Sequence, residues 1–221
     1  DWDEHYGTVG TDDASQGTTS LWQQIKDNPD LSDFAQVLEE TKIFRQHRKT
    51  PVSYADLLSG GQLFTVIAPV NGTFDKDALL EMVQTAQGDS VVEKSFVQNH
   101  LSRSLNSITK DDKRMLLLNN KYAETADGMV EGIAITTPNL RAKNGVLHIA
   151  AAHIPYERNL YETLSDDEQL SGIGAVLHRY DEDYFDADNS ISSGIVEGVP
   201  IYVDSVIIER NRMLDRLGYI N

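Results

Sequence analysis

The chain has 221 residues, of which 40% are apolar and none is cysteine. This apolar share is enough to bury a core, which excludes global disorder, and the missing cysteines exclude disulfides, thiolate metal sites and cysteine nucleophiles. Nineteen Lys and Arg against 35 Asp and Glu give a formal net charge of −16. So acidic a chain would be repelled by nucleic acid phosphates and by an anionic membrane surface. No apolar run reaches the length of a membrane span.

The chain begins with a segment that differs in composition from the rest. Residues 1–19 are acidic, rich in Gly, Ser and Thr and poor in aliphatic residues, which predicts a flexible leader. Ser20 is a predicted N-cap for a short helix, which Asn28-Pro29 ends. The i, i+3, i+4 spacing of Phe34, Val37 and Leu38 predicts a second helix that lies on a core.

The middle of the chain changes from helical to strand patterns. A helix through Tyr54 is expected to end at Gly60-Gly61. The β-branched apolar run Leu63–Ala68 predicts a strand that is buried on both faces. Asp75 can cap the next helix, and a further helix is expected from Ser90 to His100.

Residues 115–154 alternate short apolar runs with turn residues, a pattern typical of hairpins. Helices followed by a run of strands favour an α+β fold over an alternating α/β fold. We therefore expect one α+β domain over residues 20–156, in which 65–68 and 145–149 form buried strands.

Three segments together resemble the fasciclin domain family. They are "TVIAPVNGTF" (65–74), "FVQNH" (96–100) and "NGVLHIAAAHIP" (144–155), and both their order and their spacing match the family over roughly residues 19–156. The resemblance implies a compact β-wedge or sandwich flanked by helices, with a role in extracellular adhesion or surface interaction. It also implies structural roles for seven motif residues: Thr65, Pro69, Asn71, His100, Gly145, His148 and Pro155.

The sequence departs from the family pattern at two positions. Val70 stands where Thr is usual, so one side-chain hydrogen bond of the turn is not expected. Ala151 stands where Asp is frequent, in a region implicated in integrin contact for some animal members. The second departure weakens the case for integrin binding.

No catalytic, cofactor or metal site is predicted. His148 and His153 are five residues apart on an expected strand, so they should point to opposite faces and cannot chelate one metal ion together. No serine nucleophile motif or phosphate loop occurs, and no carboxylate pair stands out. Four residues match positions of a calcium-loop template: Asp186, Asp188, Ser190 and Glu197. Because Ile191 stands where this template needs Gly, the segment is expected to be a solvated acidic loop instead.

The segment 160–179 repeats 21–40 without a gap, with six identical positions such as Ser32 and Ser171. The repeat predicts that residues 157–221 are the opening portion of a second fasciclin-like domain, incomplete in this chain. Within it, Ile201–Ile208 is expected to be an inserted strand. The remainder of that second domain is then one expected partner.

These features favour a non-enzymatic extracellular module that binds a surface protein or polysaccharide, with no cofactor and with ligand-binding residues that the sequence does not identify. The acidic leader and acidic insertion resemble Bacteroidetes-type outer-membrane lipoproteins, in which a lipidated Cys before Asp1 would supply the membrane anchor. Three alternatives stay open: an accessory protein of bacterial glycan capture, a carboxylate-dependent glycan hydrolase, and a structural spacer.

Overall fold

The computed structural model describes residues 17–45, 48–166, 170–196 and 199–216. The chain divides into two compact units, Asp1–Tyr156 and Glu157–Asn221. Residues 1–16 of the predicted leader lie outside the described residues. Among the described helices, none is long and apolar enough to cross a membrane.

Short helices open the first unit where the sequence predicts them. The Ser20 hydroxyl accepts a hydrogen bond from the backbone N–H of Gln23 at 3.2 Å, so it caps the first helix. A capping box between Ser53 and Asp56 begins the helix that was expected around Tyr54. The elements are α2 (Leu21–Asp27), the 3₁₀ turn η1 (Pro29–Leu31), α3 (Ser32–Glu40) and α4 (Tyr54–Ser59).

An antiparallel hairpin that the sequence analysis missed lies between α3 and α4. It is formed by β1 (Lys42–Arg45) and β2 (Arg48–Ser53). Its strands are short, and basic residues interrupt the apolar alternation that marks a half-buried strand. The hairpin is a two-stranded sheet separate from the main sheet.

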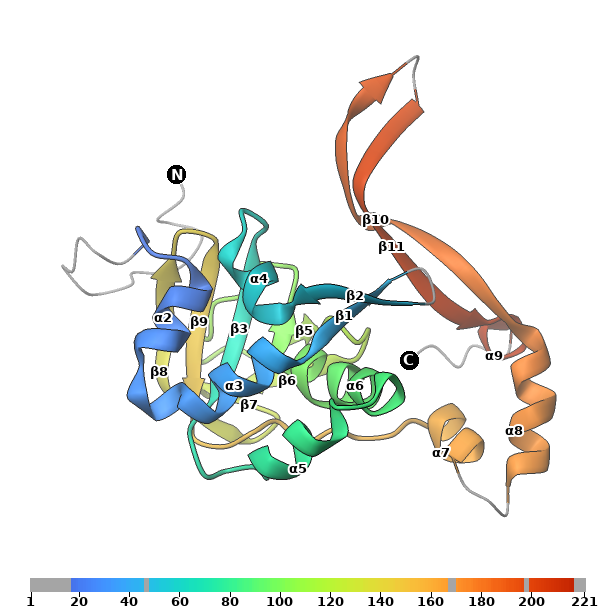
Figure 1. Ribbon diagram of the computed structural model, residues 1–221, viewed down its shortest axis with the longest axis horizontal. Coiled ribbons are helices and arrows are strands. Elements are labelled where there is room, and N and C mark those ends of the chain that lie inside the picture. Colours follow the sequence, from blue (N-terminus) through green and yellow to red (C-terminus); the bar gives the residue numbers. More distant parts are fainter. Residues whose placement is uncertain (1–16, 46–47, 167–169, 197–198, 217–221) are drawn as a thin grey trace. The chain divides into compact units, whose positions relative to one another are not determined.

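A mixed seven-stranded sheet forms the centre of the first unit, and together with the helices it confirms the predicted α+β class (Figure 1). The only parallel pair within this sheet joins the two predicted buried strands, β3 (Phe64–Pro69) and β9 (Gly145–Ala150). The sheet order is β4 (Leu101–Ser102), β3, β9, β8 (Ile133–Ala142), β7 (Met129–Val130), β6 (Tyr122–Ala126) and β5 (Lys113–Leu116).

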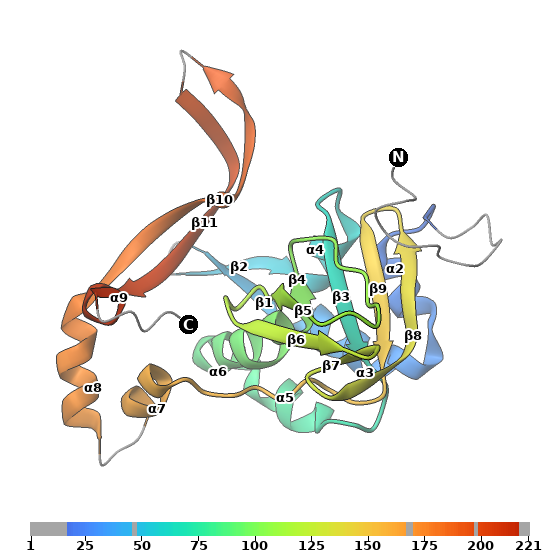
Figure 2. The same ribbon diagram turned by 180° about the vertical axis from the view of Figure 1, so that it is seen from behind.

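Strand β3 is buried along its whole length because both of its faces are covered. Val66 and Ala68 pack into the core under the helices, whereas Ile67 packs into a second core with residues of β5 to β7 such as Met115 and Val130. Figure 2 shows β5 to β7 on the side of β3 and β9 opposite to α2 and α3. Because successive side chains of a strand point to opposite faces, alternate residues of β3 pack into two different cores, as expected for a strand that is buried on both faces.

Four further helical segments connect β3 to β4. Asp75 caps the first of them, as predicted, through a 3.0 Å bond from the backbone N–H of Ala78. The helix expected to begin at Ser90 begins four residues earlier and ends at His100 as predicted. Its last part changes from α to π and then 3₁₀ geometry. The segments are α5 (Lys76–Met82), α6 (Ala86–Val92), the π-helix η2 (Glu93–Val97) and the 3₁₀ helix η3 (Gln98–His100).

The second unit combines short helices with one long antiparallel hairpin. Its elements are α7 (Leu160–Asp166), α8 (Ser171–Leu177), η4 (His178–Tyr180), β10 (Asp181–Val196), β11 (Val199–Asn211) and α9 (Arg212–Arg216). The predicted strand 201–208 lies within β11. The prediction of an acidic loop is wrong for Asp186, Asp188 and Ser190, because all three lie within strand β10, and Glu197 lies outside the described residues.

Candidate functional site

His100 is fully buried, and both of its ring nitrogens are bonded to the backbone. Nδ1 lies 2.7 Å from the carbonyl oxygen of Phe96, and Nε2 accepts the backbone N–H of Ile154 at 2.8 Å. Because Nε2 accepts, Nδ1 carries the proton and donates it to Phe96. Burial lowers the pKa of His100 to about 4, although the bond to Phe96 opposes this shift. The imidazole is therefore neutral at pH 7 and holds η3 to the segment after β9.

Asn99 strengthens the same connection. Its Nδ2 donates to the carbonyl oxygens of Ile154 at 3.1 Å and of Pro155 at 3.2 Å. Its Oδ1 accepts from Nδ2 of Asn119 at 2.9 Å. Pro155 thus contributes its backbone carbonyl to the network. The carbonyls of Ile154 and Pro155 and the side chain of Asn119 together hold Asn99, and with it the end of η3, in place.

His148 holds the opposite side of the sheet with the other tautomer. Nδ1 accepts the backbone N–H of Asn139 at 2.9 Å, so Nε2 carries the proton and donates it to the carbonyl oxygen of Asn106 at 2.7 Å. Burial lowers the pKa of His148 to about 4. The hydroxyl of Thr65 donates to Ser104 at 2.7 Å and accepts the N–H of Asn106 at 2.9 Å. Thr65 and His148 together hold residues 104–106 against β3 and β9.

The other motif residues lie at turns and at a close backbone approach. Pro69 ends β3 opposite Ala150. The amide of Asn71 donates to the carbonyl oxygen of Pro29 at 2.8 Å and accepts the N–H of Asp33 at 2.9 Å, which ties the turn after β3 to α3. Gly145 has φ +149°, and a Cβ at this position would lie 1.9 Å from the carbonyl oxygen of Phe64.

His153 lies elsewhere than the sequence analysis expected. It follows the end of β9, and its Nδ1 lies 2.7 Å from the carbonyl oxygen of Thr73. The argument that His148 and His153 share a strand is therefore wrong. Within the described part of the chain, no three His, Cys, Asp or Glu side chains lie together so that they could hold a metal ion.

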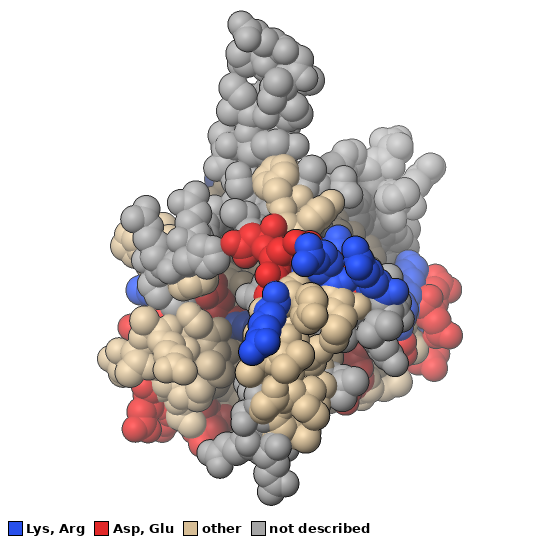
Figure 3. All heavy atoms as spheres, turned by 90° about the vertical axis from the view of Figure 1, so that its right-hand side faces the viewer, with Lys and Arg blue, Asp and Glu red and all other residues tan. Residues whose placement is uncertain are grey.

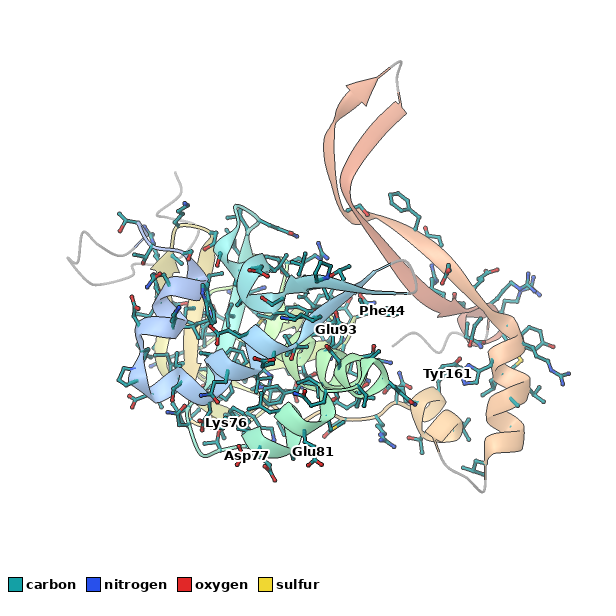
Figure 4. All side chains as sticks on the ribbon, in the orientation of Figure 1. Phe44, Lys76, Asp77, Glu81, Glu93 and Tyr161 are labelled. Carbon is teal, nitrogen blue, oxygen red and sulfur yellow. The ribbon has the colours of Figure 1, made fainter. Side chains whose placement is uncertain are left out.

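Two buried carboxylates that the sequence analysis missed bind the edge of the β1–β2 hairpin. The oxygens of Asp89 accept the backbone N–H of Lys42 at 3.1 and 3.2 Å. Those of Glu93 accept the N–H of Phe44 at 3.0 and 3.2 Å (Figure 4). The two acids are four residues apart and only 4% exposed, so one helical face presents both carboxylates to the edge of β1.

The carboxylate of Glu93 also accepts the hydroxyl of Tyr54 at 2.7 Å. Burial, together with the charge of Glu93, raises the pKa of the Tyr54 phenol well above its usual value. The phenol is therefore a hydrogen-bond donor at neutral pH rather than a base. The sequence signal that could have identified this arrangement is a pair of acidic residues, Asp89 and Glu93, spaced four apart on a helix face whose other residues are apolar.

In the second unit a polar cluster joins the helices to the base of the hairpin. The hydroxyl of Tyr161 lies 2.7 Å from Nδ1 of His178 and donates to Oδ2 of Asp181. Nδ1 of His178 lies 2.5 Å from the same carboxylate oxygen. Nδ2 of Asn211 donates at 2.7 Å both to Oδ1 of Asp181 and to the carbonyl oxygen of Leu177. Figure 4 shows Tyr161 on α7.

Large apolar side chains are exposed on both units. In the second unit, the described residues of this kind lie on α8, on η4 and at the start of β10. On the face that Figure 3 draws, uncharged surface lies beside charged side chains of both signs. Exposed fractions reach 52% for Ile173 and 50% for Tyr184. The exposed residues of this kind are Phe44, Val52, Leu63, Met82, Val91 and Tyr122 in the first unit, and Ile173, Val176, Tyr180, Tyr184 and Phe185 in the second.

Comparisons with known proteins give likenesses to solved structures but no match in sequence. No family model matches the sequence, and no curated protein matches it. A solved structure of a FAS1 domain pair from the insect cell adhesion molecule fasciclin I aligns with this chain at a TM-score of 0.44 and 13% sequence identity. The alignment covers 62% of this chain and 50% of that chain, so this chain spans about half the length of that structure.

Proposed function

We propose that this chain is a non-enzymatic interaction module of fasciclin type that binds a protein or polysaccharide at a cell surface. The observation that carries the proposal is the state of the two motif histidines. Each has a neutral, buried ring whose two nitrogens are bonded to the backbone, so neither can serve as a general base or bind a metal without breaking the fold.

The exposed aromatic side chains of the second unit are the proposed contact surface. Tyr180 and Tyr184 are four residues apart in the sequence, and the exposed carboxylates of Glu182 and Asp183 lie between them. Tyrosine supplies a large contact area and a hydroxyl at low entropic cost, so it is enriched in surfaces that bind other macromolecules. Cell-surface display through an N-terminal lipid anchor, in an outer-membrane lipoprotein, is part of the proposal, with or without a role in glycan capture.

The test combines a glycan array and a panel of purified surface proteins with a turnover assay on every ligand that binds. Binding without product supports the module, whereas product formation would show a glycan hydrolase, and blank screens would leave only a spacer. Tyr184→Ala should weaken binding about tenfold or more, as the loss of an aromatic contact residue does.

Tyr122→Ala is a matched control for the Tyr184 variant. Both tyrosines are 50% exposed, and an Arg lies over each ring, Arg114 at 5.5 Å and Arg210 at 4.9 Å. If the Tyr122 variant lost binding while the Tyr184 variant kept it, the contact surface would lie on the first unit.

A further inference from the structure

The β1–β2 hairpin is a basic segment in an acidic chain. Residues 42–49 hold four Lys and Arg and no Asp or Glu, whereas the rest of the chain has 15 Lys and Arg against 35 Asp and Glu. The register places Arg45 directly opposite Arg48, and Phe44 opposite Lys49. Like charges directly opposite each other in a sheet repel. The hairpin therefore carries a local repulsion that an acidic partner would lower.

The first unit holds this hairpin by its backbone. The carboxylates of Asp89 and Glu93 accept the backbone N–H groups of Lys42 and Phe44 along one edge of β1. The hairpin is a sheet of its own, separate from the main sheet (Figure 1). Phe44 is 44% exposed and Val52 is 41% exposed. Exposed apolar side chains beside cations, on a backbone that is held in place, are typical of a contact surface.

The start of β10 has the opposite charge and similar exposed apolar residues. Residues 181–188 contain five Asp and Glu and no Lys or Arg. Tyr184 and Phe185 in this segment are exposed, and so is Tyr180 just before it. The guanidinium of Arg210 lies 4.9 Å from the ring centre of Tyr184, so an aromatic ring of this segment already accepts an arginine. The segment thus offers both carboxylates and aromatic rings to cationic side chains.

We propose that the β1–β2 hairpin of one copy of this chain docks on the start of β10 in a second copy. The proposal rests on the proposed function, because it names the partner of the aromatic contact surface of the second unit. It is carried by the opposite charges of residues 42–49 and 181–188 and by the apolar side chains exposed on both. Arginine pairs with carboxylates through two bonds and stacks on aromatic rings, so Arg45 and Arg48 should dominate the contact.

This local attraction acts against the net charge of −16 on each copy. At physiological ionic strength the Debye length is about 8 Å, so charges elsewhere on the two copies are largely screened from each other. Charges that are in contact are screened less, and their attraction can exceed the overall repulsion. In about 1 M salt the Debye length falls to about 3 Å, which weakens exposed charge pairs as well.

The proposed contact joins two different surfaces, so it is heterologous. A copy that docks its hairpin on a neighbour still offers its own β10 segment to a third copy. The expected products are therefore open chains or closed rings, of which the smallest is a dimer joined by two such contacts. In open chains the number of copies should increase with concentration.

The experiment follows the mass of the full chain by analytical ultracentrifugation, from micromolar to millimolar concentration. We expect a mass that increases with concentration in about 0.15 M salt and returns to that of one copy in about 1 M salt. A chain that is a monomer at every concentration, or an association that persists in the concentrated salt, would overturn the proposal.

Charge reversal identifies the two surfaces. The hairpin variant Arg45→Glu/Arg48→Glu and the β10 variant Glu182→Lys/Asp183→Lys should each be monomeric. Asp181 is left unchanged, because it holds the polar cluster at the base of the β10–β11 hairpin. A mixture of the two variants should form a complex, since the intact hairpin of one meets the intact β10 segment of the other. The complex would also show that both variants are folded, whereas a mixture that stays monomeric would refute the contact.

A matched control makes the same change of charge elsewhere on the first unit. Lys113→Glu/Arg114→Glu alters two exposed residues of β5 and should associate as the original chain does. If this control were also monomeric, net charge alone would govern association and the proposal would fall.

The result is separable from the test of the proposed function. If the chain binds a ligand of the array through Tyr184 but is always a monomer, the proposed function stands and the docking of copies is wrong. If copies associate as expected but the chain hydrolyses a glycan that it binds, the docking stands and the proposed function is wrong.

Discussion

Mild acid should destabilise the first unit through its two buried histidines. The folded pKa of His100 and of His148 is about 4, against 6.5 for a solvated histidine. Because the folded pKa is the lower one, the unfolded chain takes up protons first as the pH falls. Stability is therefore fully present above about pH 6.5 and is lost progressively between pH 6.5 and 4.

The magnitude follows from these pKa values. For one site that titrates at 4 when folded and at 6.5 when unfolded, lowering the pH from 7 to 5 costs about 2 kcal/mol. The two histidines together then account for about 4 kcal/mol. Most carboxylates remain ionised at pH 5, so this interval separates the histidines from general acid unfolding.

The assay is urea unfolding at pH 7, 6 and 5, with His148→Gln beside the original chain. The variant should be less stable at pH 7 by roughly 1–3 kcal/mol, because buried partners lose a bond. It should also lose about half of the pH dependence. The reasoning is refuted if the variant shows the same drop between pH 7 and 5 as the original chain, since the drop would then come from other groups.

Two further substitutions test the packing of the first unit. Gly145→Ala should destabilise by about 2–5 kcal/mol, the sum of overpacking and backbone strain, because its Cβ would overlap the carbonyl oxygen of Phe64 at 1.9 Å. Gly132→Ala, with φ +73° and open space around it, should show the strain alone, and an equal loss in thermal stability for both would contradict the overlap. Glu93→Gln should cost roughly 1–3 kcal/mol in chemical unfolding and lower the pKa of Tyr54 in an ultraviolet titration, whereas the exposed control Glu81→Gln should change neither.

The local pattern of the sequence was sufficient for most elements of the first unit. Capping residues such as Ser20 and Asp75 predicted where helices begin, because a side chain three residues before a backbone N–H satisfies it locally. The β-branched run of β3 predicted a strand covered on both faces. The hairpin β1–β2 was missed, because its edge is held by Asp89 and Glu93, more than 40 residues away in the chain.

The sequence alone determined the α+β class, the positions of the principal helices and strands of the first unit, and the burial of the motif segments, since these depend on local caps and on hydrophobic period. The tertiary structure decided which side chains meet. It gave His100 and His148 opposite tautomers, placed His153 beyond the strand, and turned the expected acidic loop into β10. It also brought Tyr161 to His178 and Asp181, 17 and 20 residues away. Such contacts depend on how elements pack, and no local periodicity encodes that.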